Sequence, residues 1–343
     1  MKSSELFPVI MAGGRGTRFW PASVKRRPKQ FMDLLGGGTM IQLTAARFMG
    51  LAEQNNVMVV TGAEHGETVL EQMPWIAREN LLLEPAGRNT APCIGWAAET
   101  LRRRGLGHCI MIIAASDHMI SPVQGFRNTL EKAVKLAEEG CLCTIGIPPD
   151  HPATGYGYIR RGKAKEPGWT IRSFTEKPDL QTAADYLRSG EYLWNSGMFV
   201  WKADAFLHEL EKHMPGLYRD LVKLPDTTAP SLEVYGALDA ISVDYGVMEK
   251  TSLGVMVEAE FSWSDIGDWP GARKAGVKRG ESMLIDSDDV LVYDETGRLT
   301  VVVGLKGASV VSTDRVTLVM ADSDSQSIRD VVKELEESRP ELV

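Results

Sequence analysis

The chain has 343 residues, a formal net charge of −8 and 43% hydrophobic residues. That length allows one large domain with a small one, and the hydrophobic fraction is ordinary for a globular protein with a sizeable core. The negative charge argues against a nucleic-acid partner, and no segment approaches the roughly 20 apolar residues that a transmembrane helix needs. The four cysteines form no CxxC pair, and free thiols in a chain of this size fit a reducing, cytoplasmic location.

The first half of the chain alternates short apolar runs with helix-like segments. The expected strands are residues 6–11, 56–61, 109–114 and 142–147, and the expected helices are residues 40–53, 64–73, 91–104 and 125–139. This alternation predicts an α/β fold in which a mostly parallel sheet carries helices on both faces. Ligands of such sheets bind at the carboxyl ends of the strands.

The second half is less regular and then changes character. We expect strands at 155–160, 170–175 and 198–201, helices at 181–188 and 203–213, and a proline-bearing connection at 215–230. After Gly280, short β-rich runs at 290–293, 299–303, 309–312 and 317–320 precede an amphipathic helix at 328–337. The sequence therefore predicts a large domain over residues 1–280 and a small β-rich module with a terminal helix over residues 281–343.

A glycine-rich loop after the first strand carries the strongest functional signal. Residues 11–31 read MAGGRGTRFWPASVKRRPKQF, with six basic and no acidic side chains. Glycines let backbone N–H groups turn toward an anion, and Arg and Lys bind phosphate oxygens. No GK[ST] follows, and Arg18 or Phe19 stands where a dinucleotide loop has its last glycine, so neither common nucleotide fingerprint applies. A solvated basic loop is the alternative, and a phosphate-binding loop is favoured.

Two carboxylates are candidates for a metal site. Chemistry at a nucleotide phosphate normally needs a divalent cation, and Mg²⁺ usually takes one or two protein carboxylates. Asp117 lies in Ser116-Asp117-His118 at the tip of a predicted strand, where a turn or a helix cap would explain it equally well. WSDIGDW, residues 263–269, offers a second carboxylate, because its tryptophans could hold the loop rigid while either Asp265 or Asp268 points into the cleft; a turn with solvated aspartates is the alternative.

The string LEPAGRNTAP, residues 83–92, predicts a loop of fixed shape because of its prolines and glycine. Guanine presents two adjacent donors, N1–H and the 2-amino group, and one carboxylate can accept from both. Glu84 is therefore a candidate for reading guanine. The alternative is an ion pair between Glu84 and Arg88 within the loop.

Three further strings suit a pocket for hydroxyl groups. TGYGYI at 154–159 offers glycines for close backbone approach and aromatic walls, FTEKP at 174–178 places Glu176 beside Lys177, and WNSGM at 194–198 supplies the Asn195 amide. Carboxylate and amide groups suit sugar hydroxyls, and an ammonium suits a sugar phosphate. Taken singly, the three strings are better explained as a hairpin, a surface ion pair and an ordinary turn.

Taken together and in this order, the strings resemble a known family. GGRGTRFWP followed by PKQF resembles the signature loop of the sugar-nucleotide pyrophosphorylases, and the PKQF form is similar to the mannose-1-phosphate guanylyltransferase branch. EPAGRNTAP, TGYGYI, FTEKP, WNSGMF, DYGVMEK and WSDIGDW are similar to further elements of that branch, with Gly246 in place of the usual alanine of DYAVMEK. The resemblance covers about residues 9–269, and the tail after Gly280 is only loosely recognisable.

The resemblance implies a Rossmann-like catalytic domain of the nucleotide-diphospho-sugar transferase type, with a small β-helix-like module that is often used in dimer contacts. A homodimer is accordingly expected, and the length leaves no room for an added isomerase domain. The implied catalytic residues are Arg18, Lys29, Asp117, Asp265 and Lys177, and Asp117 and Asp265 are the implied Mg²⁺ ligands. The implied substrate-binding residues are Gly13, Gly14, Arg15, Gly16, Thr17, Glu84, Asn89, Thr90, Gly157, Glu176 and Asn195.

The reaction expected from these motifs joins GTP to mannose-1-phosphate, giving GDP-mannose and pyrophosphate. It requires positioning and charge neutralisation rather than a covalent protein intermediate. One alternative is another sugar-1-phosphate or nucleotide, and a second is a catalytically silent subunit that binds nucleotide sugars. Silent subunits tend to lose the loop arginine or a metal aspartate, and this chain keeps both. A dehydrogenase is disfavoured because the last glycine of its fingerprint is missing.

Overall fold

The computed structural model describes residues 5–14 and 16–343, so that Arg15 of the predicted phosphate loop lies outside the described residues. The chain forms two compact units that are interleaved along the sequence. The first unit runs through Gly13 and resumes over residues 45–115 and 120–263, and the second comprises residues 14–44, 116–119 and 264–343. The predicted division at residue 280 follows sequence character, whereas the contacts group the glycine loop with the C-terminal module.

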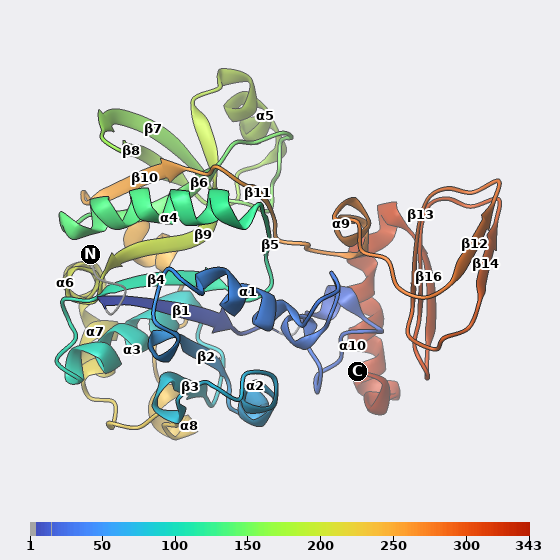
Figure 1. The fold of residues 1–343 in the computed structure, drawn as a ribbon, viewed down its shortest axis with the longest axis horizontal. Helices are drawn as coiled ribbons and strands as arrows, with labels where there is room; N and C mark the ends of the chain where they lie inside the picture. Colours follow the sequence, from blue (N-terminus) through green and yellow to red (C-terminus); the bar gives the residue numbers. More distant parts are fainter. Residues whose placement is uncertain (1–4, 15) are drawn as a thin grey trace. The chain divides into compact units, whose positions relative to one another are not determined.

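The first unit is built on a nine-stranded sheet with the order β3-β2-β1-β4-β9-β6-β10-β8-β7 (Figure 1). Strands β3 (Leu81–Glu84), β2 (Met58–Gly62), β1 (Leu6–Ala12) and β4 (Ile110–Ala115) are parallel. β9 (Tyr192–Lys202) runs antiparallel between β4 and β6 (Leu142–Ile147), and β10 (Gly254–Glu258) is parallel to β6. β7 (Tyr158–Lys165) and β8 (Gly168–Thr175) form an antiparallel edge. The predicted α/β class with a largely parallel sheet is confirmed.

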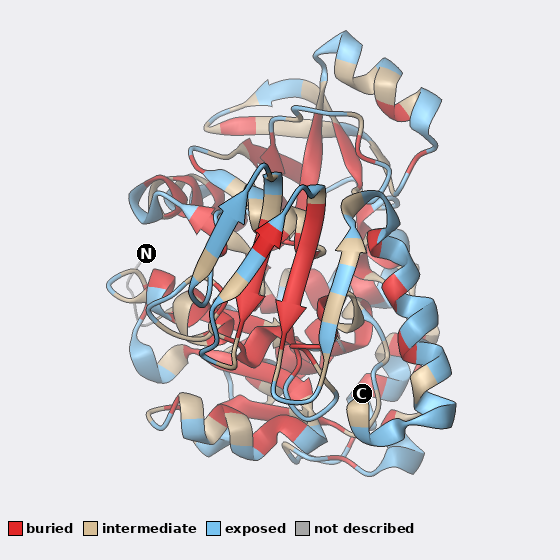
Figure 2. Ribbon diagram, turned by 90° about the vertical axis from the view of Figure 1, so that its right-hand side faces the viewer, coloured by how far each residue is buried: buried red, intermediate tan, exposed pale blue. Residues whose placement is uncertain are grey.

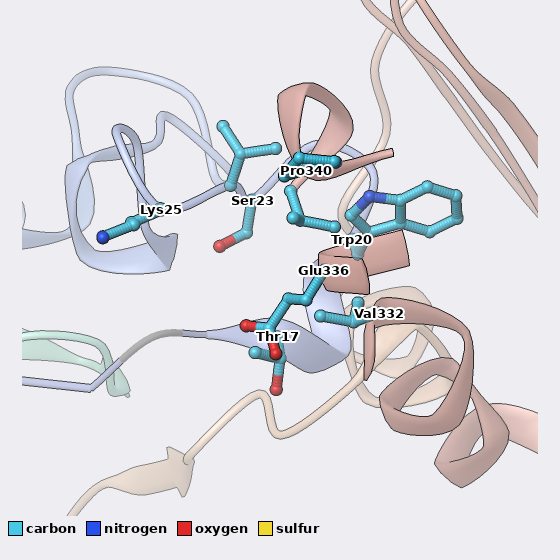
Figure 3. Close-up of a pocket in the computed structure, with 9 residues that line it drawn as sticks. Thr17, Trp20, Ser23, Lys25, Val332, Glu336 and Pro340 are labelled. Atoms are coloured by element: carbon cyan, nitrogen blue, oxygen red, sulfur yellow. The ribbon is translucent and has the colours of Figure 1, made fainter. Parts of the chain in front are cut away.

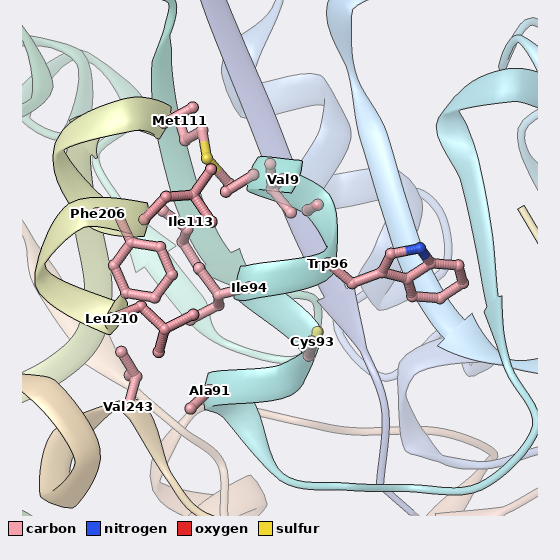
Figure 4. Close-up of a cluster of buried hydrophobic side chains, with 14 of the residues drawn as sticks. Val9, Ala91, Cys93, Ile94, Trp96, Met111, Ile113, Phe206, Leu210 and Val243 are labelled. Carbon is pink, nitrogen blue, oxygen red and sulfur yellow. The ribbon is translucent and has the colours of Figure 1, made fainter. Parts of the chain in front are cut away.

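Both faces of the sheet are covered. Phe7 and Val9 of β1 belong to a core with α3 (Thr90–Arg103), α6 (Ala203–His213) and α7 (Pro215–Val222), whereas Ile10 is fully buried on the opposite face. The helix α4 (Val123–Glu138) contacts β6, β9 and β10. Figure 4 shows Phe206 and Leu210 of α6 close to Ile94 of α3. The shorter helices are α1 (Met40–Phe48), α2 (Gly66–Gln72), α5 (Leu180–Ser189) and α8 (Leu232–Tyr235).

Helix α7 corrects one expectation, because residues 215–222 were predicted to be part of a connection. Pro215 occupies the first turn, where a helix does not need its missing N–H. Leu217 and Leu221, four residues apart, are buried in the core beside α3 and α6. This apolar pair was the available signal, and the prolines obscured it.

The second unit is rich in short strands. β12 (Ser282–Ile285) pairs in parallel with β14 (Thr300–Val303), and β15 (Lys306–Ser312) lies between β13 (Asp288–Asp294) and β16 (Thr317–Ala321). Figure 2 shows buried and exposed strands next to each other in this unit. Its core also takes in the glycine loop and the helices α9 (Trp269–Lys274) and α10 (Ile328–Ser338); members include Phe19, Trp20, Met32, Trp269, Tyr293, Val311 and Val332.

Residues 5–14 and 16–343 contain no helix with both the length and the continuous apolar character that a membrane crossing requires.

Candidate active site

The glycine loop is a chain of tight turns in the second unit. It contains two 3-10 helices, Thr17–Phe19 and Lys29–Phe31. Gly16 has a φ of 59°, in the left-handed region that favours glycine. A Cβ at Gly16 would lie 2.9 Å from Ser23 Oγ and 3.0 Å from the backbone nitrogen of Lys29. The loop therefore folds back on itself at Gly16, and this brings Lys29 next to the glycines.

Lys29 joins the two aspartates that the motifs single out. Its Nζ donates to Asp117 Oδ2 at 3.0 Å and to the backbone oxygen of Asp265 at 2.5 Å, and the residue is only 4% exposed. A Cβ at Gly267 would lie 3.3 Å from Arg18 Nη1 and 3.2 Å from Asp265 Oδ2, so both side chains border the same glycine. The second unit thus brings together Arg18, Lys29, Asp117 and Asp265 from three distant stretches of sequence.

Asp117 is a carboxylate at neutral pH. Burial raises its pKa, but the Lys29 ammonium and His118 outweigh burial, and the net pKa lies below its ordinary value. The residue lies in a turn directly after β4 and does not cap a helix.

The donor set of this cluster suits Mg²⁺. Among the described residues, no group of three or more His, Cys, Asp or Glu side chains is arranged to hold a metal ion. Asp117 and Asp265 together provide the one or two carboxylates that Mg²⁺ usually takes, with water and substrate phosphates as its remaining ligands.

The two aspartates of WSDIGDW have different tasks. Asp268 Oδ1 accepts the Gly271 N–H at 2.9 Å and so caps α9, and its Oδ2 accepts the Ser325 hydroxyl at 3.1 Å. Ile266, between the aspartates, has a φ of 40°, a strained conformation for a β-branched residue. Asp268 is therefore held by the fold, while Asp265 turns toward Arg18.

Glu84 ends β3 in the first unit. It is buried, its Oε1 accepts the Tyr235 hydroxyl at 2.6 Å, and burial raises its pKa. A Cβ at Gly13 would lie 4.0 Å from Glu84 Oε2, so the ends of β1 and β3 meet here. The described structure has no ion pair between Glu84 and Arg88. Glu84 therefore contacts Tyr235 instead of forming the loop ion pair that was the alternative to guanine binding.

Asn89 and Thr90 shape the start of α3. Asn89 has a φ of 65°, and its side chain accepts the Thr90 N–H at 2.8 Å. The Thr90 hydroxyl accepts the Val243 N–H at 2.9 Å. Both side chains therefore make contacts within the protein, and their roles in substrate binding remain predictions.

Asn195 lies within β9, so the explanation of WNSG as an ordinary turn is wrong. Its Nδ2 donates to Asp244 Oδ1 at 2.9 Å, and its Oδ1 accepts the Thr144 hydroxyl at 2.9 Å. The register of β9 against β6 shifts between Thr144 and Gly146, which indicates a β-bulge at this point.

Glu176 and Lys177 form the surface ion pair that was the alternative to a role in substrate binding, and their binding roles stay predictions. Lys177 Nζ donates to Glu176 Oε1 at 2.8 Å, and this hydrogen bond raises the pKa of the lysine. A Cβ at Gly157 would clash with Glu176 Oε2, so the glycine leaves room for this carboxylate. Lys177 has a φ of 47°, and such strain is often found at functional sites.

Asp244 lies with Asn195 and Glu176, although the sequence motifs predicted no role for it. It begins a π-helix, Asp244–Met248, a form that is frequent at functional sites. Burial and the nearby Glu176 carboxylate raise the pKa of Asp244 to about 6. The string DYGVMEK marked the segment, but nothing local in it indicated a contact with Asn195.

Comparisons with known proteins agree with these features. A model of the nucleotidyl transferase family matches residues 7–280, and a model of the MannoseP isomerase/GMP-like beta-helix domain matches residues 280–335. The mannose-1-phosphate guanylyltransferase of Escherichia coli (strain K12) is 38% identical over 359 residues, which cover 98% of this chain and 74% of that protein. The xanthan biosynthesis protein XanB of Xanthomonas campestris pv. campestris (strain B100) is 37% identical, covering 97% of this chain and 73% of that protein. The crystal structure of a mannose-1-phosphate geranyltransferase from Thermus thermophilus matches with a TM-score of 0.89 and 29% identity, over 97% of this chain and 99% of that chain.

Proposed function

The chain belongs to the mannose-1-phosphate guanylyltransferases of the nucleotidyl transferase family, and from that premise we propose that it converts GTP and mannose-1-phosphate to GDP-mannose and pyrophosphate. A phosphate oxygen of mannose-1-phosphate forms a bond to the α-phosphorus of GTP. The bond from that phosphorus to the bridging oxygen breaks, and pyrophosphate leaves with the electron pair. The convergence of Lys29, Arg18, Asp117 and Asp265 is the observation that carries this proposal.

We assign the triphosphate of GTP to the second unit. Asp117 and Asp265 would hold Mg²⁺, which neutralises phosphate oxygens when it is bound. Arg18 and Lys29 stabilise the charge of the triphosphate and of the departing pyrophosphate. Gly14, Gly16 and Thr17 present backbone N–H groups of the loop to the same phosphates, and we assign Arg15 to this loop on its sequence position alone.

We assign the guanine base and the sugar to the first unit. The Glu84 carboxylate accepts from N1–H and the 2-amino group of guanine, since the Tyr235 hydroxyl occupies only one of its lone pairs. Asn89 and Thr90 lie close to it in sequence and contribute to the same loop. Glu176, Asn195 and Asp244 bind mannose hydroxyls, Gly157 leaves room for Glu176, and Lys177 holds the sugar phosphate.

A release assay for pyrophosphate tests the proposal. The purified protein is incubated with Mg²⁺, each of the four common nucleoside triphosphates and a panel of sugar-1-phosphates. We expect the highest kcat/KM for GTP with mannose-1-phosphate. A higher value for another pair would change the assigned specificity, and binding of nucleotide without any release would make the protein a silent subunit.

From the raised pKa of Asp244 we predict that the affinity for the sugar phosphate depends on pH. Its pKa of about 6 lies above the ordinary value of an aspartate, and donating sugar hydroxyls favour the ionised form. The KM for mannose-1-phosphate should therefore rise up to about tenfold between pH 7 and pH 5. Because the substrate phosphate also titrates in this range, Asp244→Asn serves as the reference that retains only the substrate's titration.

The same raised pKa makes a second, independent prediction for this variant. A folded-state pKa above the unfolded one means that the folded protein binds more protons between about pH 4 and pH 6. Measured relative to Asp244→Asn, wild-type stability should therefore fall over that interval as the pH rises. If KM and the free energy of unfolding depended on pH in the same way in wild type and Asp244→Asn, Asp244 would not belong with the residues that bind the sugar.

We further propose a cytoplasmic homodimer that forms through the outer face of β12 and β14. The paired residues Met283 and Val301, and Ile285 and Val303, are all exposed on this two-stranded sheet. Val302 is buried on the inner face with Val292 and Val310. An exposed apolar stripe on short strands is costly in water and favours pairing with a second copy.

A charged substitution tests this interface. Val301→Lys should convert the dimer to a monomer in sedimentation or light-scattering measurements, because it buries an unpaired charge. Val319→Lys is the matched control, since Val319 is similarly exposed but lies on β16 of the other sheet. A monomeric wild type, or a Val301→Lys dimer of unchanged affinity, would contradict the assignment.

A further inference from the structure

Two tryptophans link the glycine loop to the Asp265 turn. Trp269 Nε1 donates to the backbone oxygen of Trp20 at 3.1 Å. Trp20 Nε1 in turn donates to the backbone oxygen of Leu342 at 2.8 Å. Both indoles are buried, and all three residues belong to the second unit. The hydrogen bonds therefore form a chain from the C-terminal segment through the loop to the WSDIGDW turn.

Trp269 also contacts the loop through its ring. Its centroid lies 4.9 Å from that of Phe19, and Lys29 Nζ lies 5.4 Å from the centre of the Phe19 ring. Phe19 follows Arg18 directly. The position of the Trp269 indole therefore bears on both cations assigned to the triphosphate.

The loop has little regular structure of its own to hold these cations. Between Thr17 and Phe31 it has two 3-10 turns and one isolated bridge, Val24 to Arg27. Trp20 also lines a pocket of about 270 Å³ together with Val332 and Pro340 (Figure 3). Core packing and the hydrogen bond from its Nε1 to the Leu342 carbonyl together fix the orientation of the Trp20 indole beside this pocket.

We propose that Trp20 and Trp269 are positioning residues, which set Arg18 and Lys29 for the triphosphate of GTP without touching the substrate. The C-terminal segment takes part by supplying the Leu342 carbonyl as the anchor. The inference rests on the proposed function, since it concerns the GTP phosphates. The proposal predicts a change in the affinity for GTP and none in the affinity for the sugar phosphate, whose assigned residues lie in the first unit.

Trp20→Phe and Trp269→Phe test the proposal, because each keeps an aromatic ring and removes one N–H donor. We expect the equilibrium dissociation constant for GTP, measured by calorimetry, to rise at least fivefold in each variant, with a fall in kcat. The KM for mannose-1-phosphate should stay within twofold of wild type. Both residues belong to one series of hydrogen bonds. The loss of GTP affinity in the double variant should therefore be smaller than the product of the two single losses.

Trp201→Phe is the matched control. Trp201 is fully buried in the first unit, and the structure describes no acceptor for its Nε1. It should lower the unfolding temperature and leave both substrate constants unchanged. If Trp20→Phe and Trp269→Phe, like this control, lowered only the unfolding temperature, the positioning role would be overturned. An inactive wild type would instead count against the proposed function, and GTP binding by calorimetry would still test the inference.

Discussion

Asp265→Asn should lower kcat by roughly 10²–10³-fold, and Asp117→Asn should do the same. Each substitution keeps the size of the side chain and removes one of the two negative charges assigned to Mg²⁺. Lys29 retains the backbone oxygen of Asp265 as an acceptor in both variants, so the loop should keep its fold. The measurement is steady-state release of pyrophosphate over a range of Mg²⁺ concentrations, with circular dichroism to establish folding.

Asp268→Asn is the control for this experiment, because it lies three residues away in the same turn. Asparagine caps helices as well as aspartate does, so the contact with Gly271 N–H should survive. We expect nearly normal kcat and at most a small loss of stability. If Asp265→Asn and Asp268→Asn had equal activities, Asp265 would not be a metal ligand.

Glu84→Gln should reduce kcat/KM for GTP by about 10–200-fold, since one charged hydrogen bond contributes about 1.5–3 kcal/mol. A glutamine offers one acceptor and one donor, so it cannot accept from both N1–H and the 2-amino group of guanine. The preference for GTP over ITP, which lacks the 2-amino group, should therefore shrink toward unity. The measurement compares kcat/KM for the two nucleotides in wild type and variant.

Glu209→Gln controls for the removal of a buried carboxylate. Glu209 is buried on α6, where it is held by Lys212 and His213. It should lose stability and keep the wild-type ratio of GTP to ITP. An unchanged ratio in Glu84→Gln would show that guanine is read elsewhere, and the backbone near Gly13 would be the next candidate.

The packing of the second unit explains why the loop motif combines apolar residues with glycines and cations in one short stretch. Phe19, Trp20 and Met32 are core residues of the second unit, together with Trp269 and Tyr293. The apolar residues of GGRGTRFWP therefore serve packing, while its glycines and cations are the residues that we assign to the phosphates. Because one short stretch meets both demands, few substitutions within it can be neutral.

The amino-acid sequence by itself predicted the strands β1, β2, β4 and β6, whereas β3 and β10 were not among the expected strands. It also supplied the residue types from which the candidate site is proposed. Buried strands such as β1 and β6 are continuous apolar runs, and Lys29, Asp117 and Glu84 lie in strings whose residue types already suit phosphate, metal and guanine. Such features are local, so a reader of the sequence can find them.

Only the tertiary structure decided which residues from distant segments meet. It separated Asp265, beside Arg18, from Asp268, which caps α9. It brought Asp244 to Asn195, and it joined the glycine loop to the C-terminal module in one core. Residues far apart in the chain come together because the fold buries their apolar neighbours jointly, and no local periodicity encodes that choice of partner.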